Sequence, residues 1–511
     1  MLPFLLAAAT AAAQGDADGD KAFVLDYSDL GGKPYSVSFD RRAIRLGGKP
    51  ALLLSGSIHY PRSTPGMWPK LMAEARAAGL NTIESYVFWN YHQRELADYN
   101  NGRYDYSGRG NVTTFLQAAQ DANLFVIWRF GPYICAEWPS GGMPAWLNQV
   151  PGDHPRSPTP VWEKVVGKWA SDHFSLIAPF LAKNGGPVIM SQAENEYGCR
   201  ASDPNCARYM QSLSDLAKKL DTGLLWENCH GTVAPGMIGA SNGCGGSAGC
   251  VAPAFTSAKS NLSITTRGGS HSQQVCRDSR IVLPSLPGNF SDSSTFPAMI
   301  TEDEQWFDYW GFGNVERSTA SVAYGVASFM ATGGAMHNYY MWHGGNHYGN
   351  WSLNGESDQA HDGPHGNLPQ ERVPFDFDIE WNEGHPALGS TGPVASTNTQ
   401  RYANAAPVHS DGTRNEPRWS HLAALQHLIR DHSEAMLTTS GVAAPTSNSS
   451  FGCAGLETHD SQPGVCVVYA ANTSQEITFA IGGSGGHTEP PAPWHNGSCC
   501  QPVLRLAWIC A

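Results

Sequence analysis

The sequence predicts an α/β fold in which eight parallel strands and their helices close into a (β/α)8 TIM barrel, followed by a short helical linker and a small, truncated β domain. Two observations predict this class. Short apolar segments alternate with helical patterns over about 330 residues, which favours a (β/α)8 barrel over an open doubly wound sheet. Several of these segments also end in polar or acidic residues, and barrels of this kind carry their functional groups at the C-terminal ends of the strands.

The predicted barrel elements follow one another along the chain. Residues 51–60, ALLLSGSIHY, are predicted to form the first strand. Residues 69–79, PKLMAEARAAG, are predicted to form a helix because Leu71, Ala75 and Ala78 recur at intervals of three and four. Further strands are predicted at 81–90, 124–133, 187–196, 224–229, near 237–238, at 298–303 and at 336–342.

The chain is predicted to divide into a signal peptide at 1–13, the catalytic barrel at 24–395, a linker helix region at 396–440 and a C-terminal β region at 441–511. The first segment has an apolar core and small residues at Ala11 and Ala13, which suit signal peptidase. Stretches rich in Gly, Ser and Pro at 242–293 and 344–417 are predicted to be long rim loops. Residues 465–483 alternate as β-strands do.

Two of the predicted strands end in carboxylates. The stretch 185–198, GGPVIMSQAENEYG, leads into Glu196, and PAMITE leads into Glu302 just before the aromatic segment 306–311. A single acidic residue at a strand end is most often only a polar residue leaving the sheet. Two such carboxylates are what glycoside hydrolysis requires, because one protonates the leaving oxygen while the other attacks the anomeric carbon or activates water.

With these motifs the chain resembles glycoside hydrolase family 35, the β-galactosidases. The resemblance covers roughly residues 24–440. It implies a retaining exo-glycosidase that needs no cofactor and releases terminal non-reducing β-D-galactose from glycans or polysaccharides. The motifs occur in the family's order at 55–92, 130–147, 185–198, 300–311 and 339–345, with a helical stretch at 416–437.

The resemblance implies separate roles for the two carboxylates. Glu196, in the Asn-Glu pair that closes its strand, would be the acid/base, and Glu302 would be the nucleophile. Glu194 and Glu304 are the respective alternatives, the second because Trp306 follows Glu302 at a shorter spacing than in well-known relatives. A retaining mechanism would place the two working carboxyl groups about 5 to 5.5 Å apart.

The resemblance also implies substrate contacts. Asn195 would donate a hydrogen bond to the 2-hydroxyl of the sugar, and Glu137 would chelate neighbouring hydroxyls or form a buried salt bridge with Arg129. The implied set of substrate-binding residues is Tyr86, Cys135, Ala136, Glu137 and Asn195.

Some positions depart from the family pattern. Gln93 stands where the family usually has Glu, and residues 343–348, HGGNHY, replace the usual Gly-Gly-Thr-Asn-Phe. Galactose as the only substrate therefore does not follow. The alternatives are a β-glycosidase of another specificity on the same barrel and a non-catalytic carbohydrate-binding protein, against which the presence of both carboxylates argues.

Composition disfavours several classes of partner and is compatible with the carbohydrate that the resemblance implies. The net charge is −13 and no basic cluster could neutralise phosphates, so nucleic acid is not an expected partner. No segment offers 18 consecutive apolar residues, so no membrane span is expected. The 16 tryptophans suit sugars, whose apolar faces stack on aromatic rings. The histidines near 343–365 are separated by Gly and Pro, and no metal site is predicted.

Sequons and cysteines favour the secretory pathway, with the mature protein outside the cell or in a vacuole or lysosome. The chain has seven N-x-S/T sequons, of which Asn111 is the first. The twelve cysteines fall mainly in clusters, one of them with Cys229, and suggest disulfides. Cys199 and Cys206 are predicted to form a bridge, and Cys135 is predicted to be a free thiol.

Overall fold

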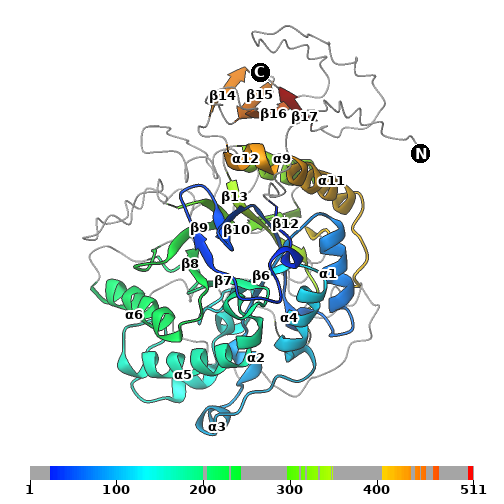
Figure 1. The fold of residues 1–511 in the computed structure, drawn as a ribbon. Coiled ribbons are helices and arrows are strands. Elements are labelled where there is room, and N and C mark those ends of the chain that lie inside the picture. The colour runs from blue at the N-terminus through cyan, green and yellow to red at the C-terminus, as the bar shows by residue number, and fades with distance from the viewer. Residues whose placement is uncertain are drawn as a thin grey trace.

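A closed barrel of eight parallel strands forms the centre of the computed structural model (Figure 1). The strand order around the barrel is β10-β13-β4-β5-β6-β7-β8-β9, so that the last barrel strand along the chain, β13, pairs with the first, β4. The predicted (β/α)8 class is confirmed. The structure describes residues 24–198, 204–229, 232–242, 296–309, 312–316, 319–331, 334–346, 348, 351, 405–438, 443–448, 451–455, 464–470 and 505–509.

Each predicted barrel segment contains one strand, including the weak segment near 237–238. The strands β6 and β7 are buried on both faces, as expected for the apolar runs of a parallel sheet covered by helices. The barrel strands are β4 (Leu53–Ile58), β5 (Thr82–Tyr86), β6 (Phe125–Arg129), β7 (Val188–Gln192), β8 (Leu225–Cys229), β9 (Ile238–Asn242), β10 (Ala298–Glu304) and β13 (Gly334–His343).

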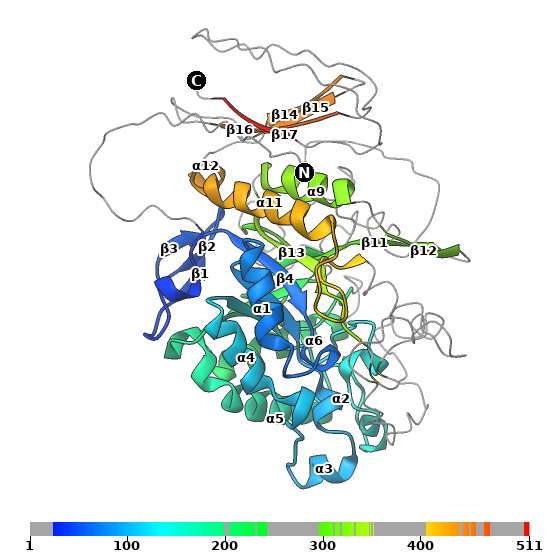
Figure 2. The same ribbon diagram turned by 90° about the vertical axis from the view of Figure 1, so that its right-hand side faces the viewer.

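Helices surround the barrel on the outside (Figures 1 and 2). The first of them buries Trp68, Leu71 and Ala75, the face that the spacing predicts. The side chain of Asn111 caps the helix that follows it by accepting from the main-chain N–H of Thr114. The barrel helices are α1 (Trp68–Ala77), α4 (Val112–Asp121), α5 (Pro160–Leu176), α6 (Pro204–Leu220) and α9 (Thr319–Ala331), with the shorter α2 (Trp89–His92) and α3 (Leu96–Asn100) after β5.

The segment before the barrel closes its N-terminal end. It contains a three-stranded antiparallel sheet of β1 (Val37–Phe39), β2 (Ile44–Leu46) and β3 (Lys49–Ala51). Ile44 and Leu46 belong to the same apolar cluster as Phe125 and Ile189, which lie on barrel strands. The hydroxyl of Tyr35 donates to the main-chain oxygen of Gly186 just before β7. Because apolar side chains fill this end, a functional site is expected at the C-terminal end of the barrel.

The predicted linker helix at 416–437 is two helices. They are α11 (Arg418–Asp431) and α12 (Ser433–Thr438), and the chain leaves helical geometry at His432. The hydroxyl of Ser433 donates to the main-chain oxygen of Arg430, replacing a hydrogen bond of the helix.

Two further sheets complete the described fold. A hairpin of β11 (Trp306–Tyr309) and β12 (Phe312–Glu316) extends from the barrel (Figure 2). An antiparallel sheet lies within residues 443–509 and consists of β14 (Ala443–Asn448), β15 (Phe451–Gly455), β16 (Gly464–Ala470) and β17 (Arg505–Ile509). The predicted signal peptide at 1–13 and most of both predicted rim loops lie outside the described residues. Within the described ranges, no helix has both the length and the apolar character needed to cross a membrane.

Candidate active site

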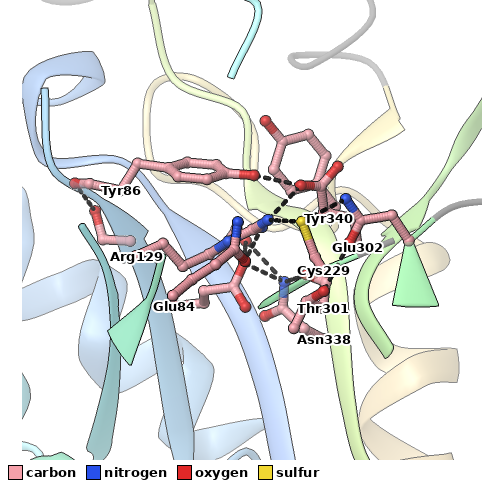
Figure 3. Close-up of polar contacts among 12 residues, drawn as sticks. Glu84, Tyr86, Arg129, Cys229, Thr301, Glu302, Asn338 and Tyr340 are labelled. Carbon is pink, nitrogen blue, oxygen red and sulfur yellow. Dashed lines mark hydrogen bonds and ion pairs between the residues drawn. The ribbon is translucent and has the colours of Figure 1, made fainter. Parts of the chain in front are cut away.

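Three of the predicted site residues, Tyr86, Asn195 and Glu302, contact a single arginine at the C-terminal end of the barrel. Arg129 ends β6, and its Nη1 donates to Oε1 of Glu84 at 2.9 Å. Its Nη2 donates to Oε1 of Glu302 at 2.6 Å and to Oδ1 of Asn195 at 2.9 Å. The guanidinium also lies 4.1 Å from the centre of the Tyr86 ring. Figure 3 shows this cation between the two carboxylates.

Glu302 is a buried carboxylate near the end of β10, with 7% of its surface exposed. Its Oε1 accepts from Arg129 and from the hydroxyl of Tyr86 (Figure 3). Both hydrogen bonds are made to the same oxygen, one of them charge-assisted. This leaves Oε2 as the oxygen available to a ligand.

Asn195 is oriented by donors that contact its oxygen. Its Oδ1 accepts from Arg129, from Nε2 of Gln192 at 3.1 Å and from the thiol of Cys229 at 3.1 Å. A guanidinium can only donate, so the atom that faces it must be the amide oxygen. The Nδ2 of Asn195 is therefore available to donate to a sugar hydroxyl.

Glu196 is exposed, in contrast to Glu302. Its Oε1 accepts from Nδ2 of Asn242 at 3.0 Å. The hydroxyl of Thr301 donates to Oδ1 of Asn242 at 2.6 Å, which fixes the orientation of that amide. The neutral donor from β9 thus holds one oxygen of Glu196, and its exposure gives access to a leaving group or to water.

Glu194, the alternative acid/base, has a different environment. It is 1% exposed and pairs with Arg156, whose Nη2 lies 2.9 Å from Oε2. Its Oε1 accepts from the hydroxyl of Tyr209 at 2.5 Å, and Oε2 also accepts from the main-chain N–H of Asn195. Both oxygens are engaged inside the protein, so this carboxylate is not available to a substrate.

Glu304, the alternative nucleophile, lies at the end of β10 and is partly buried. Burial raises its pKa well above the usual value for a glutamate, and the neighbouring Glu302 and Glu196 raise it further. A protonated carboxyl is a poor nucleophile, so its environment favours Glu302 over Glu304 for that role.

Glu137 does not form the salt bridge with Arg129 that was one predicted alternative. Arg129 pairs with Glu84 and Glu302 instead, because those carboxylates project from barrel strands beside it. The Oε2 of Glu137 accepts from the hydroxyl of Tyr340 on β13 at 3.2 Å. Its predicted chelation of sugar hydroxyls stays a prediction.

The segment of Cys135, Ala136 and Glu137 has three consecutive residues with positive φ, of 54°, 58° and 42°. Such backbone is uncommon for non-glycine residues and persists where the surroundings impose it. The Nη2 of Arg62 donates to the main-chain oxygens of Ala136 and Glu137 at 2.7 and 3.1 Å. The buried arginine therefore holds this rim segment in its unusual conformation.

The sequence reasoning missed two buried acids below the site. Burial raises the pKa of Glu84 to about 7 although Arg129 opposes the shift, and it raises the pKa of Glu227 on β8 to about 8 against the same opposition. With Glu302 they place three carboxyl groups around one cation, so they cannot all be ionised at little cost. A glutamate inside a buried strand, as in TIESY and LWENC, was the signal available in the sequence.

The cysteine predictions have different outcomes. Cys135 is a thiol, as predicted. Cys229 is also a thiol, although its cluster suggested a disulfide; it is buried at the C-terminal end of β8, where its sulfur contacts Asn195. Cys206 is disulfide-bonded, while its predicted partner Cys199 lies outside the described residues. Among the described residues, no group of three or more His, Cys, Asp or Glu side chains is placed to hold a metal ion.

A (β/α)8 barrel with acidic side chains at the ends of β7 and β10, one buried beside an arginine and one exposed, is typical of the glycoside hydrolases. The sequence model of the glycosyl hydrolases family 35 matches residues 43–361, and the chain belongs to this family.

Curated relatives carry the name β-galactosidase. Beta-galactosidase 8 of Arabidopsis thaliana is 30% identical over 455 residues, which cover 88% of this chain and 43% of that protein. Beta-galactosidase 6 of Oryza sativa subsp. japonica is 30% identical over 486 residues, covering 93% of this chain and 46% of that protein. The chain thus spans less than half the length of these relatives.

Among solved structures, the β-galactosidase from the psychrophilic Marinomonas ef1 has 9% sequence identity and a TM-score of 0.43, and the alignment covers 76% of this chain and 62% of that one. This similarity is too low to support an argument about the present chain.

Proposed function

We propose that this protein is a retaining exo-glycosidase that hydrolyses terminal non-reducing β-D-galactosides. Family membership and the names of the curated relatives support the substrate class. The observation that carries the mechanism is the contrast between the two carboxylates. Glu302 is buried with both its donors on one oxygen, whereas Glu196 is exposed and accepts from a neutral amide. These environments suit a nucleophile and an acid/base.

In the first step, Oε2 of Glu302 attacks the anomeric carbon while Glu196 gives its proton to the glycosidic oxygen. The bond between the anomeric carbon and that oxygen breaks, the aglycone leaves as an alcohol, and an α-linked glycosyl ester forms on Glu302. Arg129 and Tyr86 stay on Oε1 and keep the carboxylate pointed at the sugar. The Nδ2 of Asn195 donates to the 2-hydroxyl, where hydrogen bonds strengthen in the transition state.

In the second step, the same groups act in reverse. Glu196, now a carboxylate, takes a proton from water, and the water oxygen attacks the anomeric carbon. The ester bond breaks, Glu302 regains its negative charge, and galactose leaves with its β configuration retained. This mechanism requires a separation of about 5 to 5.5 Å between the carboxyl groups of Glu196 and Glu302.

Azide rescue tests the two assignments separately. The Glu302→Gly variant is expected to lose turnover and to regain it with azide, giving the α-galactosyl azide. The Glu196→Ala variant, with an activated aryl β-galactoside and azide, is expected to give the β-azide. Product stereochemistry is read by NMR.

Other results would contradict the proposal. Exchanged azide stereochemistry would refute the roles, and an inverted product from the wild type would refute retention. Hydrolysis of another aryl β-glycoside in preference to the galactoside would move the proposal to that specificity. Binding of sugars without any hydrolysis would indicate a carbohydrate-binding protein.

We also propose that the protein works in an oxidising compartment, outside the cell or in a vacuole or lysosome. The disulfide at Cys206 supports this location, because disulfides are rare in the cytosol.

A further inference from the structure

The backbone on either side of Asn195 is strained. Glu194 has φ of 63° and Glu196 has φ of 48°, so two non-glycine residues in the left-handed region flank Asn195. This turn sends Glu194 into the protein and Glu196 out to solvent. Each such conformation persists only where neighbouring groups determine it, so the turn must be held from outside the strand.

Arg156 contacts three residues of the turn, on both sides of Glu196. Its Nε and Nη2 donate to Oε2 of Glu194 at 3.1 and 2.9 Å. The same Nη2 donates to the main-chain oxygen of Asn195 at 3.1 Å. Its guanidinium lies 5.1 Å from the centre of the Tyr197 ring, and the hydroxyl of that tyrosine donates back to the main-chain oxygen of Arg156. Glu196 is therefore bracketed by residues that this one arginine holds.

Two further contacts make this arrangement rigid. The guanidinium of Arg156 lies 3.9 Å from the centre of the Tyr133 ring, and only 6% of the residue is exposed. From α6, the hydroxyl of Tyr209 donates to Oε1 of Glu194. Burial alone would lower the pKa of Arg156, but Glu194 raises it above its usual value, so the arginine remains charged. The ion pair thus joins two loops, and Tyr209 ties it to a helix.

We propose that Arg156 is a positioning residue for the acid/base: through Glu194 and the main-chain oxygen of Asn195 it holds the left-handed turn that places the carboxyl of Glu196. This inference rests on the proposed function. Glu194 is the side chain of the turn that Arg156 binds, and the hydroxyl of Tyr209 donates to the other oxygen of the same carboxylate. Arg156 does not touch the reacting atoms.

The test compares two substrates that differ in their need for an acid. Phenyl β-galactoside needs its leaving oxygen protonated, whereas 2,4-dinitrophenyl β-galactoside leaves without protonation. A misplaced Glu196 should therefore lower kcat/KM for the phenyl substrate by about a hundredfold in Arg156→Met, and leave the dinitrophenyl substrate within a few-fold of wild type. Arg156→Lys, which keeps the charge, should recover part of the loss, and Tyr209→Phe should show a smaller loss of the same kind.

Asp26→Asn is the matched control. Asp26 accepts from Arg430 at 2.9 and 3.1 Å in a partly buried ion pair outside the site, so its loss should lower thermal stability and change neither substrate selectively. A parallel fall for both substrates in Arg156→Met would overturn the proposal. So would a β-galactosyl azide product from Glu194→Gln, because it would make Glu194 the acid/base itself.

A crystal structure of Arg156→Met tests the positioning without any turnover. The carboxyl of Glu196 is expected to move by about 1 Å or more relative to the wild type, the displacement at which positioning losses of this size arise. An unchanged turn and an unchanged position of the Glu196 carboxyl would overturn the positioning role of Arg156. Inactivity of the wild type on galactosides would instead refute the proposed function, and the structural comparison would still test the positioning role.

Discussion

At the scale of the residue, the site is organised by the charge of Arg129. One cation faces the carboxyl groups of Glu84, Glu302 and Glu227. Arg129 donates hydrogen bonds to the carboxyl groups of Glu84 and Glu302, whereas Glu227 remains a buried acid with a pKa of about 8. At neutral pH we therefore expect Glu227 to be protonated and uncharged, so that Arg129 interacts electrostatically mainly with Glu84 and Glu302.

The protonation of Glu227 should be visible in the stability of the protein. Its folded pKa is raised from 4.5 to about 8, so its stabilising contribution is complete below the unfolded pKa and is lost as the pH rises through 8. The loss is on the order of 1.4 kcal/mol per pH unit between these limits. Glu227→Gln, which resembles the protonated acid, should flatten the fall of the free energy of unfolding from pH 5 to pH 8, measured by urea denaturation.

Glu163→Gln on the exposed side of α5 is the control and should follow the wild type at every pH. A Glu227→Gln variant whose stability falls with pH as steeply as that of the wild type would contradict the expected protonation.

At the scale of the element, β7 depends on the two glycines before it. Gly185 has φ of 89°, and a Cβ on Gly186 would overlap the main chain of Phe180. The main-chain oxygen of Gly186 also accepts a hydrogen bond from the hydroxyl of Tyr35. This close approach fixes the position at which β7 starts. The start of β7 in turn determines where Glu194, Asn195 and Glu196 lie after the end of the strand.

Gly186→Ala should therefore destabilise the protein strongly. The added methyl group cannot be accommodated without moving the main chain, at a cost of about 1 to 3 kcal/mol or more. Gly66→Ala is the matched control, because a Cβ there has no neighbour within 4 Å. Thermal unfolding by circular dichroism should show a lower Tm for Gly186→Ala than for Gly66→Ala, and equal values would show that the strand start tolerates the methyl group.

At the scale of the whole molecule, the apolar residues that stabilise the barrel and the polar residues of the candidate site lie at opposite ends of it. The N-terminal segment with β1 to β3 fills one end of the barrel with apolar side chains such as Ile44 and Leu46. The other end carries the charged and amide side chains (Figure 3). The disulfide at Cys206 adds a covalent link at the start of α6, the helix that also carries Tyr209.

Reduction should destabilise the native protein through that link. A disulfide contributes about 2 to 4 kcal/mol, mainly by restricting the unfolded chain. Dithiothreitol should therefore lower the Tm of the wild type by more than it lowers the Tm of Cys206→Ser. Peptide mapping without reduction is expected to recover Cys206 joined to Cys199, and a different partner would correct that predicted pairing.

The sequence by itself determined the class of fold and the order of the strands. Apolar runs such as VIM and FVI must be buried, and their regular alternation with helices leaves few arrangements other than a barrel. It also placed Glu196 and Glu302 at strand ends, because these positions depend only on local order along the chain.

Only the tertiary structure decided how those side chains are used. The partners of Arg129, the engagement of Glu194 by Arg156 and Tyr209, and the orientation of Asn195 all join residues from different strands and loops. The same holds for the raised pKa of Glu227, which depends on burial and on charges across the barrel. Contacts between residues far apart in the chain, and the desolvation that accompanies them, leave no periodic pattern in a single sequence.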